Sequence, residues 1–218
     1  MTVSTMMQFL PELLSILLDQ SQGESLERLQ LCEINLLLLK PAPFQGNSCL
    51  INQQVIRSGE RDKFLSLSGR LADSSGAWLL MEINYFIRGE KKYFRAETNL
   101  IGSAQPWREF CEQDISNFFS SLNQENSFFT SHDLAILNGR TEVQVPSQLL
   151  MLETWHAMLK QWPNTHKPLS SIKAKFLASV KLGEPLSIAS KLSDSTIESM
   201  IFSAQGPVLE INASSLNH

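Results

Sequence analysis

The chain has 218 residues, enough for one large domain or two of ordinary size, with 43% apolar and 18% charged residues. This composition provides a sizeable core and excludes an intrinsically disordered protein. The formal net charge of −4 and scattered Lys and Arg argue against a nucleic-acid-binding protein, which needs a basic face. Three cysteines without metal-ligand spacing indicate reduced thiols, so we expect a cytoplasmic protein.

The first half predicts one helix followed by antiparallel strands. Leucines at helical spacing indicate a helix over residues 6–20, and Pro11 and Glu12 within it argue against a signal peptide or membrane span. Strands are expected over residues 31–40, 48–57, 63–71 and 78–87. The turns between them are too short for helical crossovers, so the strands should run antiparallel. The composition of residues 102–106 places a boundary between domains 1–102 and 103–218.

The second half centres on residues 145–162, which predict a helix that is apolar almost all round. Such a helix is buried, and Pro146 and Pro163 limit its ends. Residues 107–122 upstream are expected to form another helix. Further strands are expected over residues 172–181, from Leu186, and over 196–204 and 208–213. A buried helix followed by antiparallel strands predicts an α+β protein whose sheet wraps around the helix.

The two halves repeat the order of helix, strands and turns. Residues 39–51 overlay residues 176–188 without a gap, which places Gly46 on Gly183. The shared order favours an internal duplication. The low identity leaves chance similarity between two strand–turn–strand units as the alternative.

The segment DISNFFSSLNQENSFFTSHDLA, residues 114–135, resembles the MaoC-like family of (R)-specific enoyl hydratases and 3-hydroxyacyl dehydratases. In that family an Asp-Ile-x-x-Phe helix leads to a loop with Asp-x-Asn-Pro-x-His-x-Asp. The resemblance covers about residues 107–188. It implies a tandem, or double, hot-dog fold in which antiparallel sheets each wrap around a central helix. Residues 1–102 would form a degenerate hot-dog domain and residues 103–218 a MaoC-like one.

The chemistry of that family needs an Asp and a His that hold and activate a water molecule. Backbone N–H groups at the start of the central helix polarise the thioester oxygen. Carried over by position, the Asp falls on Gln124 and the His on Phe129, and neither side chain can perform its role. Asn126 keeps the Asn of the motif, and Ser147-Gln148 stands at the helix entrance where the family has His-Gly. The first half contains no histidine that could replace the lost one.

The resemblance therefore implies a pseudoenzyme that recognises an acyl group on coenzyme A or an acyl carrier protein, in fatty acid or polyketide metabolism. It implies no cofactor and no metal, and a dimer or a pairing with a catalytic homologue; no nucleic acid or membrane partner is expected. The expected substrate-binding residues are Gln124, Asn126, Phe128, Phe129, Ser147 and Gln148.

Two other functions stay open. Glu153 and His156 lie one turn apart on the buried helix, and hot-dog thioesterases resemble this in using a carboxylate on or near that helix. An active enzyme would be a thioesterase in which Glu153 activates water, or an atypical dehydratase that uses Glu125 or His132. More commonly, such a Glu caps or hydrogen-bonds at an interface, and such a His is partly buried and satisfied. The remaining alternative is a structural subunit.

Overall fold

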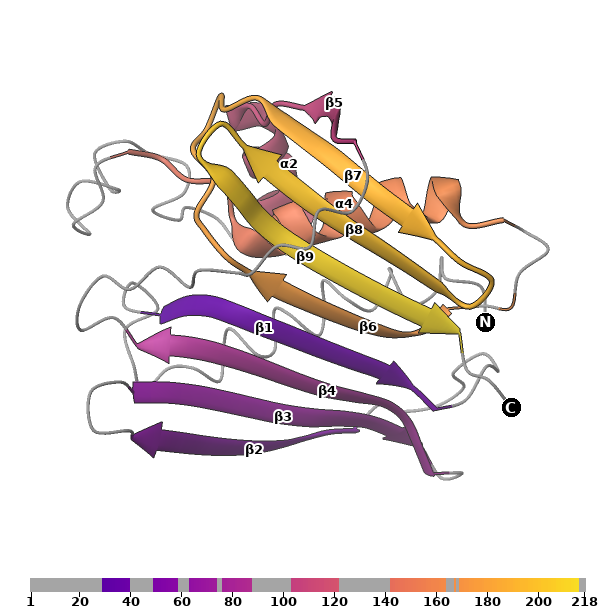
Figure 1. Ribbon diagram of the computed structural model, residues 1–218. Helices are drawn as coiled ribbons and strands as arrows, with labels where there is room; N and C mark the ends of the chain where they lie inside the picture. Colours follow the sequence, from indigo (N-terminus) through magenta and orange to yellow (C-terminus); the bar gives the residue numbers. More distant parts are fainter. Residues whose placement is uncertain are drawn as a thin grey trace.

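The computed structural model describes residues 29–39, 49–58, 63–73, 76–87, 103–121, 142–163, 167 and 169–215 (Figure 1). In chain order the elements are β1 (Leu29–Leu38), β2 (Cys49–Ser58), β3 (Lys63–Asp73), β4 (Gly76–Ile87), β5 (Gln105–Arg108), α2 (Glu112–Ser121), α4 (Ser147–Gln161), β6 (Leu169–Phe176), β7 (Leu186–Leu192), β8 (Thr196–Ser203) and β9 (Gly206–Ser215). Several predictions lie outside the described residues, namely the helix over residues 6–20 and the residues Gln124, Glu125, Asn126, Phe128, Phe129 and His132.

All nine described strands form one antiparallel sheet in the order β2-β3-β4-β1-β6-β9-β8-β7-β5 (Figure 1). The two halves meet where β1 pairs with β6, with Glu33 opposite Lys175 and Leu37 opposite Ser171. The two groups of strands therefore join edge to edge into one sheet. The pairing also covers two strand edges that would otherwise expose unpaired N–H and C=O groups.

Outward from the β1–β6 junction the strands follow in the order β1, β4, β3, β2 on one side and β6, β9, β8, β7 on the other, so that, with the added edge strand β5 left out, each side has its first, fourth, third and second strand in turn. This repeated order supports the duplication, but the gapless overlay does not preserve the faces of the sheet. Continued three residues upstream, the overlay places Leu36 on Lys173. Leu36 is buried and pairs with the buried Ile172, whereas Lys173 is exposed on the opposite face. An overlay that is displaced by an odd number of residues exchanges the two faces, because strand side chains alternate.

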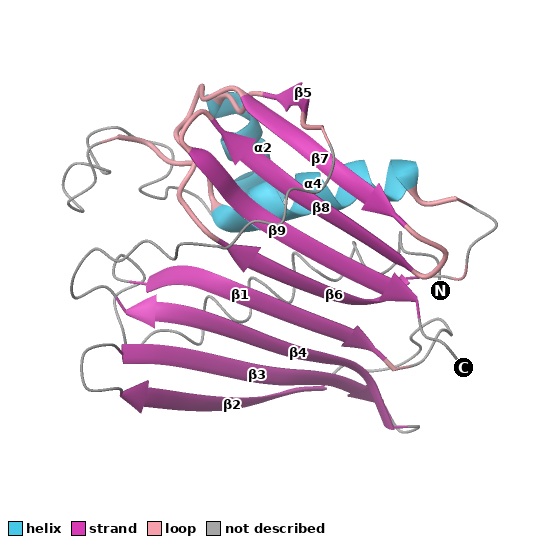
Figure 2. Ribbon diagram, in the orientation of Figure 1, coloured by secondary structure: helices cyan, strands magenta, loops and turns pink. Residues whose placement is uncertain are grey.

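Helix α4 packs on the second half of the sheet, where it contacts β8 and β9 (Figure 2). Its buried residues are Leu149, Leu150, Met151, Thr154, Trp155 and Met158. Ile201 and Ile211 of the sheet are completely buried, as expected for the strand face that packs on this helix. The helix ends at Gln161, because Trp162 is extended and Pro163 follows it. The prediction of a buried central helix is confirmed.

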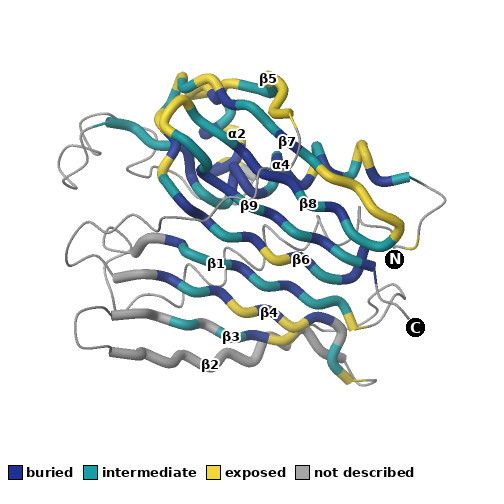
Figure 3. The backbone as a smooth tube through the Cα atoms, in the orientation of Figure 1, coloured by how far each residue is buried: buried dark blue, intermediate teal, exposed yellow. Residues whose placement is uncertain are grey.

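Burial alternates along the strands on both sides of the β1–β6 junction (Figure 3). Ile34 and Ala174 lie opposite each other and are both 0% exposed. The inner face is therefore continuous from one half to the other. The outer face carries polar pairs such as Glu33 and Lys173, whose charged atoms lie 3.3 Å apart.

The helix expected over residues 107–122 begins later, at Glu112, and is preceded by β5. Trp107 and Arg108 belong to this short strand, which pairs with β7. The helix starts where a reciprocal cap forms between two residues. The Cys111 N–H donates to the Asp114 carboxylate at 2.9 Å, and the Asp114 N–H donates to the Cys111 carbonyl at 3.1 Å.

The strand expected over residues 172–181 also ends early, at Phe176. The N–H groups of Leu177 and Ala178 both donate to the Val208 carbonyl, at 2.9 and 3.3 Å. Two donors on one carbonyl interrupt the regular ladder and turn the chain out of the sheet. Val180 is buried, as its place in the alternation suggested, although it lies beyond the strand.

Candidate functional site

The entrance of α4 carries backbone donors without partners. Pro146 is the N-cap residue and, as expected for proline, supplies no side-chain cap. Its carbonyl accepts the first helical hydrogen bond from the Leu150 N–H at 3.0 Å. Within the described part of the chain, no group accepts a hydrogen bond from the N–H of Ser147, Gln148 or Leu149. These three N–H groups and the helix dipole together favour a carbonyl oxygen or an anion at this end.

Backbone hydrogen bonds connect the segment that follows β6 with the start of α4 and with the segment before α2. The Val145 N–H donates to the Val180 carbonyl at 2.9 Å, and the Gly183 N–H donates to the Phe110 carbonyl at 3.0 Å. Gly183 has φ +75°, a conformation that residues with a side chain adopt at a cost. The segment that follows β6 therefore holds in place both the start of α4 and the segment between β5 and α2.

A cluster of charged residues lies beside α4. Arg108 of β5 donates through Nη1 to Glu153 of α4, and through Nη2 to Asp114 of α2 at 3.0 Å. Its guanidinium carbon lies 4.2 Å from the centre of the Phe110 ring, close enough for a cation–π interaction. The second Glu153 oxygen lies 3.7 Å from His156 Nδ1. One guanidinium thus connects β5, α2 and α4.

Asp114 is held in its charged form. Partial burial acts to raise its pKa, but the hydrogen bonds from Cys111 and the charge and hydrogen bond of Arg108 together outweigh this effect. The pKa of Asp114 is therefore below its ordinary value. The carboxylate stays ionised at neutral pH and remains a partner for Arg108.

The structure brings some of the expected site residues together and separates others. Ser147 and Gln148 lie at the α4 entrance, whereas Glu153 and His156 lie further along the helix in the charged cluster. The carboxylate of Glu153 already accepts from a guanidinium, which favours a role in holding elements together over a role as a base. Its catalytic role stays a prediction.

Arg108 was not among the residues that the sequence singled out. The signal available was its place next to Trp107 and close to Phe110, since aromatic rings often pack against guanidinium groups. Its partner Glu153 stands 45 residues away. No periodic pattern connects two positions at that separation.

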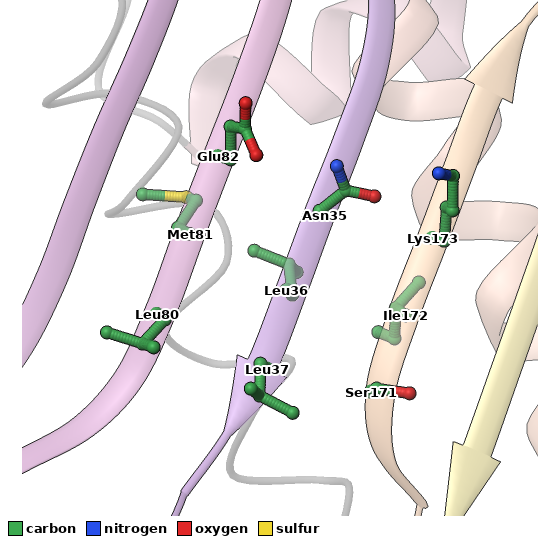
Figure 4. Close-up of a pocket in the computed structure, with 9 residues that line it drawn as sticks. All are labelled: Asn35, Leu36, Leu37, Leu80, Met81, Glu82, Ser171, Ile172 and Lys173. Atoms are coloured by element: carbon green, nitrogen blue, oxygen red, sulfur yellow. The ribbon is translucent and has the colours of Figure 1, made fainter.

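A hollow of about 310 Å³ lies elsewhere, over the junction of β4, β1 and β6 (Figure 4). Asn35, Glu82 and Lys173 contribute polar side chains to it, and Leu80 contributes an exposed apolar one. These side chains lie on the outer face, so this hollow is separate from the α4 entrance. Among the described residues, no group of His, Cys, Asp and Glu could hold a metal ion. No described helix is long and apolar enough to cross a membrane.

The sequence matches no protein-family model and no curated protein. The structure is similar to that of HtdX from Mycobacterium tuberculosis, with a TM-score of 0.72 and 12% identity over 95% of this chain and 85% of HtdX. A MaoC-like dehydratase from Phytophthora capsici gives a TM-score of 0.62 and 13% identity, over 89% of this chain and 71% of that one. An acyl-CoA thioesterase II, TesB2 from Mycobacterium marinum, gives a TM-score of 0.53 and 11% identity, over 95% and 88%.

These similarities extend over nearly the whole chain, while the identities are low. They show the fold of the chain, which is the hot-dog fold in the tandem arrangement, with the large antiparallel sheet described above. The fold expected from the sequence is therefore confirmed, and the resemblance to MaoC-like dehydratases holds at the level of the fold.

Proposed function

We propose that the chain binds acyl thioesters of coenzyme A or an acyl carrier protein, with the thioester oxygen at the entrance of α4. The observation that carries this proposal is the set of unpartnered N–H groups of Ser147, Gln148 and Leu149. A thioester oxygen is an acceptor, and donors at a helix start hold it while the helix dipole favours its partial negative charge. The names of two proteins with this fold, a MaoC-like dehydratase and an acyl-CoA thioesterase, fit the same class of ligand.

The proposal includes the loss of hydratase chemistry. Gln124 and Phe129 stand where the resembled family has its Asp and His, so water would lack both groups that activate it. Asn126 and Phe128 would contact the acyl group from the same loop, beside Gln124 and Phe129. In this proposal residues 103–218 form the domain that carries the ligand site, and residues 1–102 form a degenerate partner domain.

Hydrolysis is the second candidate, and the charged cluster argues against it. A base at position 153 needs a free carboxylate oxygen directed at water. Glu153 instead accepts from Arg108 through one oxygen, and its other oxygen faces His156. A carboxylate that is held by a guanidinium on one side and faces an imidazole on the other has no oxygen left to direct at a water molecule. Binding without hydrolysis is therefore the function that we propose.

A substitution by proline tests the helix entrance directly. Ser147 occupies the first position of α4, where proline fits a helix, and Pro146 already has the extended ψ of 130° that a following proline requires. Ser147→Pro should remove one N–H donor without breaking the helix. We expect its affinity for acyl-CoA to fall about tenfold, the effect of one hydrogen bond of ordinary strength.

Ser147→Ala is the matched control, because it removes the hydroxyl and keeps the backbone N–H. It should bind acyl-CoA as the unaltered protein does. Affinity is measured by isothermal titration with saturated acyl-CoAs of increasing length, after native mass spectrometry for a co-purified acyl ligand. If the unaltered protein binds no acyl thioester, the proposal is wrong. If Ser147→Pro binds as tightly as Ser147→Ala, the thioester oxygen does not lie at this entrance.

A further inference from the structure

The largest fully buried side chain of the described residues contains a polar group without a partner. Trp155 of α4 is only 1% exposed. Among the buried side-chain nitrogen and oxygen atoms of the described residues, its Nε1 alone has no hydrogen-bond partner. An unpartnered donor in a low-dielectric interior is unfavourable, so a protein that keeps one calls for a physical explanation.

Other polar side chains in the interior of the second half have hydrogen-bond partners. The Thr154 hydroxyl donates to the Leu150 carbonyl at 2.8 Å, and the hydroxyls of Ser190 and Ser199 lie 2.8 Å apart. The second tryptophan near the end of α4, Trp162, donates through Nε1 to the Lys167 carbonyl at 3.1 Å. Among the described residues, Trp155 Nε1 is thus the one buried side-chain nitrogen or oxygen without a hydrogen-bond partner. A phenylalanine would fill much of the same space without an unpartnered N–H.

We propose that Trp155 Nε1 is a ligand donor, and that the site takes acyl thioesters whose chain carries an acceptor oxygen, such as a hydroxyl or a keto group. This inference rests on the proposed function. An indole nitrogen donates and does not accept, so its partner must be an acceptor. In a hydrocarbon chain, a hydroxyl or keto oxygen is the simplest group of that kind.

The position of Trp155 indicates which part of the ligand it contacts. It follows Ser147 by two turns of α4, and at 1.5 Å per residue the two positions are about 12 Å apart along the axis. Helical side chains lean towards the N-terminus, which directs the indole back towards the entrance. Because the two positions are separated along the helix axis, we assign the acceptor of Trp155 to the acyl chain and not to the thioester oxygen held at the entrance.

Two matched substitutions on the same chain segment test this. Trp155→Phe and Trp162→Phe each replace an indole by a phenyl ring, but of the two only the Trp162 indole has an acceptor in the part of the chain that the structure describes. The ligands are dodecanoyl-CoA and a series of dodecanoyl-CoAs that each carry one hydroxyl, moved carbon by carbon along the chain. Affinity is measured by titration, and the thermal midpoint of each free protein is measured in parallel.

We expect the unaltered protein to prefer one hydroxylated ligand over dodecanoyl-CoA about tenfold, the effect of one added hydrogen bond. Trp155→Phe should abolish that preference while the thermal midpoint of the free protein stays unchanged or rises. Trp162→Phe should keep the preference while its midpoint falls, because it loses an internal hydrogen bond. The Trp155 indole resonance of the unaltered protein, assigned by ¹⁵N labelling, should shift with the preferred ligand and not with dodecanoyl-CoA.

Other outcomes separate the two proposals. Binding of acyl-CoAs with no preference for any hydroxylated ligand overturns the inference and leaves the proposed function intact. A preference that survives in Trp155→Phe, or an indole resonance that never moves, also overturns the inference. An equal loss of plain and hydroxylated ligands in Trp155→Phe means that the indole only packs, or binds an internal water. No binding of any acyl-CoA means that the proposed function fails, and this inference with it.

Discussion

Replacing Arg108 by methionine should weaken the contact between three elements at once. The side chain is 25% exposed and its two carboxylate partners are 29% exposed, so the ion pairs are only partly screened by water. An exposed pair contributes about 0.2–1 kcal/mol, and a hydrogen bond to a charged group about 1.5–3 kcal/mol. Arg108 forms two such partly exposed pairs, and the contribution of each should lie between the value for an exposed pair and the value for a hydrogen bond to a charged group. We therefore expect Arg108→Met to lower the free energy of unfolding by about 1–3 kcal/mol. Methionine keeps most of the packing on Phe110, so the loss reports mainly on the charge.

The assay is thermal and denaturant unfolding of Arg108→Met, Glu153→Gln and the double variant. For a chain of this size, the thermal midpoint should fall by about 2–4 °C for each kcal/mol. The two single effects should not add, because the residues share one interaction. Lys173→Met is the control: its pair with Glu33 is more exposed on the lysine side, and its effect should stay below about 1 kcal/mol. Effects of Arg108→Met and Glu153→Gln that add within about 0.5 kcal/mol would refute the ion pair.

Four further outcomes are expected. Trp155→Ala should lower the free energy of unfolding by about 3–5 kcal/mol, since it empties a large buried site; an unchanged thermal midpoint would contradict the burial. Gly183→Ala should cost about 1–2 kcal/mol in the same measurement, because φ is positive there, and Gly183→Asn should cost less. Asp114→Asn should lower the midpoint at neutral pH. The pKa of Asp114 is lower in the folded state than its ordinary value of 3.8, so the ionised carboxylate stabilises the fold fully at pH values above 3.8. This stabilisation is lost as the pH falls through the lower folded pKa. The thermal midpoints of the unaltered protein and of Asp114→Asn should therefore converge at that low pH. The unaltered protein should not hydrate crotonyl-CoA in a spectrophotometric assay, because each missing acid–base group typically contributes about 10²–10⁴-fold to the rate. The double variant Gln124→Asp with Phe129→His tests whether restoring the pair restores turnover.

The strands and the central helix could be predicted because local patterns determine them. The hairpin of β3 and β4 was expected over residues 63–71 and 78–87 and spans Lys63–Asp73 and Gly76–Ile87. Helix α4 starts directly after Pro146 and ends just before Trp162 and Pro163. In each case the apolar period and the flanking turn or proline residues stand within a few positions of one another.

The elements that could not be predicted depend on contacts between distant residues. Strand β5 is only four residues long and contains Pro106, so its sequence taken alone is typical of a turn. It is a strand because it pairs with β7. Strand β6 was expected to continue to Lys181, but the Val208 carbonyl takes two consecutive donors and ends it. The alternating pattern persists through residues 177–180, although the ladder does not. Alternation reports which side chains are buried, whereas strand length depends on where the partner strand offers its carbonyls.

The same distinction applies to the candidate site. Ser147 and Gln148 were placed at the helix entrance by the family resemblance, while the sequence pattern alone started the helix at Val145, with Pro146 in its first turn; the structure has Pro146 at the N-cap instead. Arg108 could not be predicted, because its role depends on β5, α2 and α4 meeting. The lack of an acceptor for the Trp155 N–H among the described residues could not be predicted either, because it depends on all the groups that surround the ring. The helix start and the indole are therefore two separate donors on one helix, and only the first follows from the position of a residue in the sequence.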